Sequence, residues 1–332
     1  MISILESAPW LREGNYRLIL QCQSKRPELR RYLSENGWFI REEAVVKDGK
    51  FLYTVMEVTY APEHPRLTDA IDLMGSIGSA GGQFLQLDGL AFRDEAGTRA
   101  YLSNAKAHGI RAINLTFYGT RDYHDRFAGR TGDFDYLMTI LRISLSLQLE
   151  VSVGVPLTRE NTDQAEELCL RLGNAGVSPR FFVPHAEGRG VSLDPIRLRR
   201  QDLDALSQQA KDRFNTRMYR TEAQWLHSDS LPLPERRMLT VSLTPENVEF
   251  FESLPFDETI RYLEGLDEAY YNALPPVPEL MECYGNPDSE ELYSFRDLFL
   301  HYGRQYFRDH PMELYEAIEE RFLETGEPKN MT

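Results

Sequence analysis

The chain has 332 residues, of which 42% are hydrophobic and 27% charged, and its formal net charge is −15. This length can hold one large or two ordinary domains, and the composition is ordinary for a soluble globular protein. The negative charge disfavours a broad surface for nucleic acid or anionic membranes. Acid is concentrated from residue 221 onward, where 24 Asp and Glu stand against 8 Lys and Arg. The first 220 residues are therefore close to neutral and leave room for a local nucleic-acid site.

The cysteines Cys22, Cys169 and Cys283 are few and widely spaced. An odd, sparse set without a CxxC spacing predicts neither a disulfide scaffold nor a zinc site, and it is typical of the reducing cytoplasm. The first residues carry no basic segment followed by an apolar core, so no secretory signal is expected. No run of about 18 apolar residues is present, so no membrane span is expected either.

Residues 16–60 predict a small α/β segment. A helical pattern over 26–36 stops at Asn36-Gly37, two residues that tolerate positive φ. Residues 47–50, Lys-Asp-Gly-Lys, predict a turn between strands. The strands themselves are expected at 16–22, 38–40 and 51–60.

This segment reads RLILQ…ELRRYLSENGWFIREEAVVKDGKFLYTVMEV. It resembles the last strands of the methyltransferase domain in bacterial tRNA adenine-N1 methyltransferases. In that family a strand ending in Leu-Gln precedes a helix, an Asn-Gly-Trp turn and a hairpin with Asp-Gly-Lys. The family's S-adenosylmethionine site lies upstream of the matching strands. The resemblance therefore implies shared ancestry or a fused remnant and, by itself, no activity.

Short apolar runs alternate with helical patterns through the middle of the chain. Strands are expected at 84–87, 113–118, 149–155 and 180–183, and helices at 67–77, 94–108, 134–147 and 162–172. Strands and helices that alternate at this spacing favour βαβ units and a parallel sheet.

The same region carries a series of short motifs. They are Leu87-Asp88-Gly89, Leu115-Thr116-Phe117-Tyr118-Gly119, His124-Asp125-Arg126, Gly129-Arg130, Gly132-Asp133-Phe134, Thr158-Arg159-Glu160-Asn161, Phe182-Val183-Pro184 and Gly188-Arg189. In this order they resemble the third to sixth strands of the radical S-adenosylmethionine superfamily. The resemblance covers about 60–195 and implies a partial triosephosphate-isomerase-type barrel with parallel strands inside, helices outside and S-adenosylmethionine as a ligand.

One feature of that superfamily is missing. Its members hold a [4Fe–4S] cluster by three cysteine thiolates after the first strand. Cys22 ends a predicted strand, but Arg26 and Leu29 stand where the other two ligands would fall. A [4Fe–4S] cluster and radical chemistry are therefore not expected.

Polar residues follow the predicted strands at the end where barrel enzymes place their sites. His124 and Asp125 predict an acid/base site, with a structural cap as the favoured alternative. His185, with Glu187, could shuttle a proton or bind a metal, but one pair is too few for a metal site, and a structural role is favoured. Five further polar residues at the strand ends could form a pocket for a nucleoside or small anion, or they could simply be solvated at the rim of the barrel. The sequence favours neither interpretation. The five residues are Asp88, Thr116, Tyr118, Asn161 and Arg189.

Residues 197–219 predict a basic helical region, followed by a strand at 239–243 and acidic helices from 245. We expect three parts: an N-terminal α/β segment over 1–60 that could supply the first barrel strands, the partial barrel over 61–228, and an acidic helical extension over 229–332.

The favoured interpretation is a cluster-less radical S-adenosylmethionine relative, a pseudoenzyme that binds a small molecule or protein partner at the carboxyl ends of its strands. The alternatives are an S-adenosylmethionine-dependent tRNA methyltransferase relative, against which the net charge counts, and a non-catalytic interaction protein. No membrane partner is expected.

Overall fold

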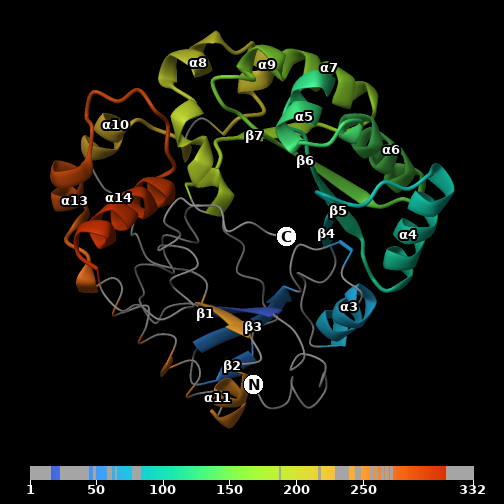
Figure 1. Cartoon of the computed structure of the whole chain (residues 1–332), viewed down its shortest axis with the longest axis horizontal. Coiled ribbons are helices and arrows are strands. Elements are labelled where there is room, and N and C mark those ends of the chain that lie inside the picture. The colour runs from blue at the N-terminus through green and yellow to red at the C-terminus, as the bar shows by residue number, and fades with distance from the viewer. Residues whose placement is uncertain are drawn as a thin grey trace.

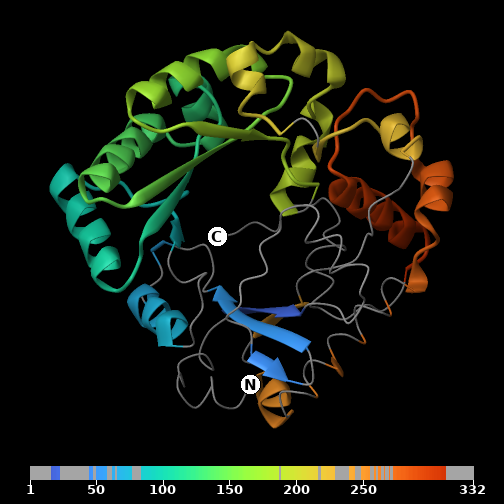
Figure 2. The ribbon, with the colours of Figure 1, turned by 180° about the vertical axis from the view of Figure 1, so that it is seen from behind.

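The architecture comes from a computed structural model of the whole chain (Figures 1 and 2). The structure describes residues 84–186, 188–215, 218–228 and 272–311, with the shorter stretches 16–22, 45–47, 50–57, 62–63, 66–76, 239–243 and 248–254 and five single residues between 258 and 269. Residues 26–36 and 38–40, where a helix and a strand are expected, lie outside the described residues.

A four-stranded parallel sheet forms the centre of the described chain. Its strands lie in the order β4 (Phe84–Gln86), β5 (Ala112–Thr116), β6 (Glu150–Pro156) and β7 (Pro179–Phe182). Every neighbouring pair is parallel. Each expected strand from 84 to 183 is therefore present, to within three residues at either end.

The helices between these strands lie on one side of the sheet, along the outer rim of the molecule (Figures 1 and 2). They are α4 (Glu95–Ala107), α5 (Arg121–Ala128), α6 (Asp133–Ser146) and α7 (Ala165–Asn174), the last preceded by the 3-10 turn η3 (Thr162–Gln164). Parallel strands with outer helices confirm the predicted α/β fold and fit a partial barrel, because a doubly wound sheet would carry helices on both faces. Whether this barrel is of the triosephosphate-isomerase type stays a prediction.

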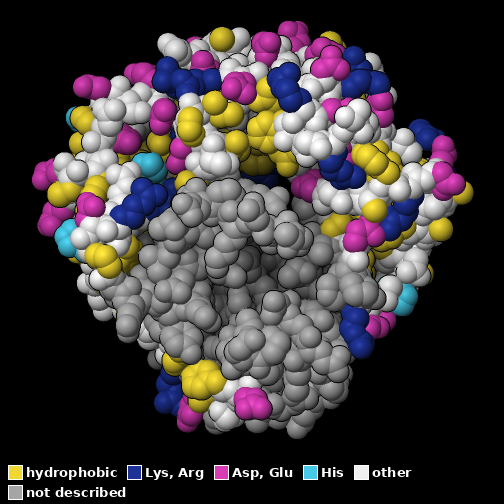
Figure 3. All heavy atoms as spheres, viewed as in Figure 1, with side chains coloured by type: hydrophobic (Ala, Val, Ile, Leu, Met, Phe, Trp, Pro, Cys, Tyr) yellow, Lys and Arg dark blue, Asp and Glu magenta, His cyan; other side chains and the backbone are white. Residues whose placement is uncertain are grey.

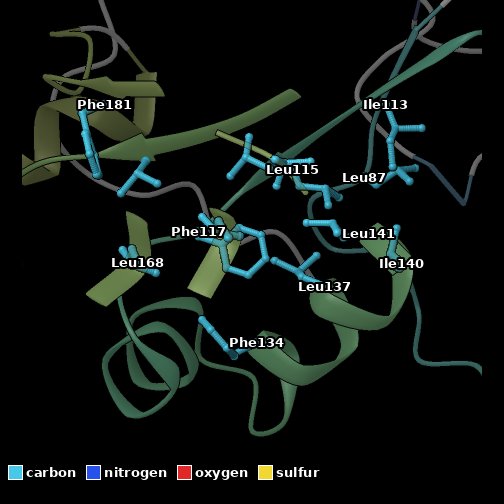
Figure 4. Close-up of a cluster of buried hydrophobic side chains, with 14 of the residues drawn as sticks. Leu87, Ile113, Leu115, Phe117, Phe134, Leu137, Ile140, Leu141, Leu168 and Phe181 are labelled. Atoms are coloured by element: carbon cyan, nitrogen blue, oxygen red, sulfur yellow. The ribbon is translucent and has the colours of Figure 1, made fainter. Parts of the chain in front are cut away.

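Alternate residues of the strands build the core under the helices. Ile113 and Leu115 of β5 are buried against Leu137 and Ile140 of α6, and Figure 4 shows these side chains meeting between the sheet and the helix. Burying each such side chain contributes roughly 1.5–3 kcal/mol. Because side chains alternate between the two faces of a strand, the positions of the apolar residues determine which face of the sheet packs against the helices.

Helix α5 was not expected from the sequence. It is only eight residues long and mostly polar, which is too short for its apolar positions to repeat over several turns. Its ends do carry signals, because Thr120 stands at the N-cap and Gly129 closes it with φ +66°. Glycine adopts this left-handed conformation without steric cost. Residues 124–126 thus belong to a helix rather than to a loop.

Strands β1 (Tyr16–Cys22), β2 (Val45–Lys47), β3 (Lys50–Glu57) and β8 (Leu239–Leu243) form a second sheet in the order β2-β3-β1-β8. All of its pairings are antiparallel. Among the described residues no ladder joins β1 or β3 to β4. That residues 1–60 supply the first barrel strands stays a prediction. The division of the chain into three parts stays a prediction.

The basic stretch 197–219 is not one helix. It contains α8 (Arg200–Ala205) and α9 (Gln208–Lys211), separated where Leu206 is extended and the Ser207 side chain accepts the Ala210 N–H. A hydroxyl that caps a new helix competes with continuation of the previous one.

Helical structure follows, as expected, in the described part of the acidic C-terminal region. The helices are α10 (Glu222–Leu226), α11 (Val248–Ser253), α13 (Val277–Tyr284) and α14 (Phe295–Asp309).

Helix α14 is hydrogen-bonded to the turn that follows β7. Arg304 is 4% exposed and donates to the Ala186 carbonyl. Asp297 of the same helix accepts the Ala186 N–H at 3.2 Å, and Arg197 donates to the Pro184 carbonyl at 3.1 Å. The C-terminal region is therefore bonded directly to the strand end where a site is expected.

Replacing Arg304 with Met should lower the free energy of unfolding by about 2 kcal/mol, because the Ala186 carbonyl loses its buried donor. Urea unfolding, followed by circular dichroism, measures the change. The matched control is Arg308→Met, an exposed arginine of the same helix, which should change stability by about 0.5 kcal/mol or less. If the two variants lost equal amounts of unfolding free energy, the proposed role of the Arg304 hydrogen bond would be wrong.

Candidate functional site

Asp88 occupies the carboxyl end of β4 and bonds to the neighbouring strand. Its Oδ1 accepts the Thr116 N–H at 3.0 Å, and its Oδ2 accepts the Thr116 hydroxyl at 2.9 Å and the Gln86 amide at 2.7 Å. The predicted pocket residues Asp88 and Thr116 are thus brought together. Gly89 turns the chain away from the strand with φ +78°.

Burial raises the pKa of Asp88, since the bonds from Thr116 and Gln86 offset only part of the lost hydration. An ionised carboxylate offers about four acceptor positions, and three are occupied here. A partly buried acid with a raised pKa and one remaining acceptor position is typical of a functional site. Asp88 is therefore the predicted residue whose surroundings fit a polar pocket best, and its contact with a ligand stays a prediction.

Two neighbouring rows on the face of the sheet away from the helices are mostly polar, and they lie between Phe84 at the start of β4 and Phe182 at the end of β7. Gln86, Asn114 and Ser152 are register partners in adjacent strands and form one row across it. The next row contains Thr116, Gly154 and Arg180. These residues are half-buried or exposed. Parallel sheets are usually apolar on both faces, so a polar, accessible face indicates a surface that meets polar groups.

Phe182 lies over the backbone of this face. A Cβ at Gly154 would come within 3.1 Å of Phe182 Cε1, so the absence of a side chain at 154 makes room for the ring. Phe182 also stacks on His185, with ring centroids 6.3 Å apart. Phe182 and His185 thus form an aromatic surface at the β7 side of the carboxyl edge, whereas Asp88 lies at the β4 side, two strands further along the sheet from the Gly154 strand.

His124 is fully buried and both ring nitrogens have partners. Nδ1 accepts the Tyr118 N–H at 3.0 Å, so Nε2 carries the hydrogen and points at Asp133, 3.2 Å away. Arg130 pairs with the other oxygen of Asp133 at 3.1 Å. In this geometry His124 holds the loop after β5 in place, and its predicted acid/base role stays a prediction.

Asp125 caps the next helix. Its two carboxylate oxygens accept the Gly132 N–H at 2.6 Å and the Phe134 N–H at 2.9 Å, at the start of α6. Burial opposes ionisation, but these two N–H groups outweigh it and lower the pKa of Asp125. This is the geometry of the structural cap that the sequence offered as an alternative.

Asn161 joins the loops after β5 and β6. Its amide donates to the Tyr118 carbonyl at 2.7 Å and to the Pro156 carbonyl at 2.8 Å, and its oxygen accepts the Thr158 N–H at 2.8 Å. The Tyr118 ring stacks on His124 at 5.4 Å. Two further predicted residues are thus brought together, with Asn161 bonded to backbone rather than directed at a ligand.

His185 meets a carboxylate that the sequence did not suggest. Its Nδ1 is 3.3 Å from both oxygens of Asp297, which lies 112 residues later in the chain. The sequence near Asp297 indicates only a helix start, because Ser294, three residues earlier, is the N-cap of α14. Glu187 and the side chain of Arg189 lie outside the described residues.

Two further searches cover the described residues. They contain no group of three or more His, Cys, Asp or Glu side chains placed to hold a metal ion. Within them no helix is both long and apolar enough to cross a membrane. In Figure 3 acidic and basic side chains are interspersed over the described part of the visible face, without one broad basic patch there.

Residues 1–78 match the family model of tRNA (adenine(22)-N(1))-methyltransferase, TrmK. The match includes residues 16–60 and supports their resemblance to tRNA adenine-N1 methyltransferases. It covers less than a quarter of the chain. No curated protein matches the sequence. The radical S-adenosylmethionine resemblance receives no support from these comparisons.

Replacing Asp125 with Ala should cost about 1–2 kcal/mol of unfolding free energy, because two N–H groups of α6 lose their acceptor. Since the pKa of Asp125 is lowered on folding, this stabilisation is present above the unfolded-state pKa and fades as the pH falls below about 4. Urea unfolding at pH 7 and pH 3 measures both effects. Asp122→Ala, an exposed acid of α5, should cost about 0.5 kcal/mol at pH 7. A cost for Asp125→Ala that does not shrink at pH 3 would argue against the ionised cap.

Proposed function

We propose that this chain binds S-adenosylmethionine and acts on tRNA as a relative of the tRNA adenine-N1 methyltransferases. The observation that carries the proposal is the family match over residues 1–78. The two resemblances in the sequence support it together, because both families use S-adenosylmethionine although they match different parts of the chain.

The proposed ligand site is the carboxyl edge of the parallel sheet. The remaining acceptor position of Asp88 suits a ribose hydroxyl or the ammonium group of the ligand. The aromatic surface of Phe182 suits an adenine ring, since base–aromatic stacking is worth about 1–3 kcal/mol. Thr116, Tyr118 and Asn161 would complete the edge, Asn161 by holding the loops in place. Arg189, whose side chain lies outside the described residues, stays a predicted member of this site.

The second candidate is a cluster-less relative of radical S-adenosylmethionine enzymes that binds a small molecule without acting on tRNA. It is favoured by the outer placement of the helices and the polar inner face of the sheet. Both candidates bind S-adenosylmethionine, but only the first acts on tRNA. Salt-dependent tRNA binding supports the first, and S-adenosylmethionine binding without tRNA binding supports the second.

Replacing Asp88 with Asn should weaken S-adenosylmethionine binding by about tenfold or more, because one charge-assisted hydrogen bond is lost. Its pKa is raised on folding, so above that pKa the ionised Asp88 lowers stability, and Asp88→Asn should unfold at the same temperature as the wild type or higher. Titration calorimetry and thermal unfolding at pH 7 measure the two effects.

The matched control is Glu166→Gln, an exposed acid on the outer helix α7, which should leave the affinity unchanged. Wild-type binding should also weaken as the pH falls through the pKa of Asp88, and Asp88→Asn should lack this dependence. If the wild type binds no S-adenosylmethionine at millimolar concentration, the proposed function is wrong. If both variants bind as the wild type does, the ligand lies elsewhere.

A further inference from the structure

Phe92, in the loop that follows β4, is 52% exposed although its side chain is large and apolar. The Arg130 guanidinium lies over one face of the ring, with its carbon 4.4 Å from the ring centroid. The Tyr136 ring meets Phe92 edge to face, with centroids 5.1 Å apart. We propose that the accessible part of the Phe92 ring stacks on an unpaired nucleobase of the tRNA. This inference deepens the proposed function and rests on it.

The backbone next to Phe92 is fixed by side chains from distant parts of the chain. The Ala91 N–H donates to the Glu63 carboxylate at 2.7 Å, and the Ala91 carbonyl accepts the Tyr136 hydroxyl at 2.8 Å. An aromatic side chain on a fixed loop loses little further freedom when a partner binds, so the same contact gives a higher affinity. The loop therefore presents Phe92 in a form that is prepared for binding.

Arg130 is fixed together with the ring on which it lies. Its guanidinium donates to the Leu90 carbonyl at 2.7 Å and pairs with the Asp133 carboxylate at 3.1 Å. The attraction between a guanidinium and an aromatic face holds the two side chains together. Because this face of the ring is covered within the protein, the exposed part of Phe92 includes the opposite face, which is available to a flat partner.

The Phe92 ring lies at the same side of the carboxyl edge as Asp88. Phe92 follows Asp88 by only four residues. The pKa of Asp88 is raised by burial and also by the negative charge of Asp133, the carboxylate that pairs with Arg130. Both observations place the stacked pair close to Asp88, which is proposed to contact S-adenosylmethionine. A base stacked on Phe92 would therefore lie beside the proposed methyl donor.

A nucleobase fits this surface because single-stranded nucleic acids bind through stacking on aromatic rings together with contacts from cations to phosphates. A second pair of an arginine and an aromatic ring lies on α5, where the guanidinium carbon of Arg126 is 5.1 Å from the centroid of the Tyr123 ring. Arg126 is exposed, so it is accessible to a phosphate. Rings alternating with arginines match an RNA strand, whose bases and phosphates also alternate.

Other roles of Phe92 make different predictions. If the ring only covered Arg130, or if it contacted a protein partner, its replacement would leave tRNA binding unchanged. If it made an apolar contact with the RNA without stacking, leucine would replace it with little loss, because leucine buries a similar apolar area. Stacking needs the π face, which leucine lacks and tryptophan extends. The order of affinities among these variants therefore identifies stacking.

The measurement is binding of fluorescently labelled, unmodified tRNA to the full chain at low salt, followed by anisotropy. Phe92→Leu should weaken this binding by about tenfold, the value of one stacked base, and Phe92→Trp should bind at least as tightly as the wild type. Stacking releases no counterions, so the dependence of affinity on salt should be the same in all three proteins. Their affinity for S-adenosylmethionine, measured by calorimetry, should also be the same.

The matched control is Phe250→Leu, which should bind tRNA as the wild type does. Phe250 of α11 is 40% exposed, and its ring also contacts a tyrosine, Tyr262, with centroids 5.3 Å apart. Figures 1 and 2 show α11 far from α5 and α6, at the opposite end of the molecule. The control therefore removes an equivalent ring that lies away from the proposed site.

Each outcome decides the inference. Equal tRNA affinities of the wild type and Phe92→Leu overturn it, and so does an equal loss in Phe92→Leu and Phe250→Leu. If Phe92→Ala binds more weakly while Phe92→Leu does not, the contact is apolar and the inference is wrong. A wild type that binds S-adenosylmethionine but no tRNA overturns it, while the first part of the proposed function stands. A wild type that binds neither overturns both.

Discussion

The alternation of side chains along the four parallel strands is the constraint on which the described structure depends. Successive residues of a strand point to opposite faces, so Ile113 and Leu115 enter the core beneath α6 while Asn114 and Thr116 face away from it. A slip of one residue would put the amide and hydroxyl under the helices and the apolar pair on the polar face. The same register therefore fixes both the core and the candidate site.

The second determinant is the bonding of α14 to the turn after β7. All the polar backbone atoms named there, the Pro184 carbonyl and both groups of Ala186, have partners from residues 197, 297 or 304. Buried backbone groups need such partners, and the two partners of Ala186, Asp297 and Arg304, come from the part of the chain that the sequence predicted to be an acidic helical extension. Removing α14 would leave both backbone groups of Ala186, in the turn that carries His185, without these partners. The site and the C-terminal region are in this sense one structure.

The sequence predicted the parallel sheet because apolar runs and helical periods are local patterns. The strand ends at 84–86, 112–116, 150–156 and 179–182 lie within a few residues of expectation. It also placed Asp88 and Thr116 at one edge, since strand ends of a parallel sheet converge. The partner of His185 was beyond this reasoning, because no local pattern connects residues 185 and 297. Helix α5 was missed because it is only eight residues long and mostly polar. The cap role of Asp125 was the favoured alternative from the sequence, whereas the role of Asn161 depends on backbone atoms of two loops that its sequence pattern does not reveal.

Energetics help to separate ligand contacts from structural ones among the predicted residues. Asp125 and Asn161 make favourable bonds to backbone groups, so their polar atoms stabilise the fold itself. Asp88 does the opposite, because burial disfavours its charged form despite three hydrogen bonds. A charge that lowers stability is retained more readily when a ligand compensates for it than when nothing does. This balance fits the proposal that Asp88, rather than Asp125 or Asn161, contacts the ligand, and it predicts that stability and binding change in opposite directions at this position.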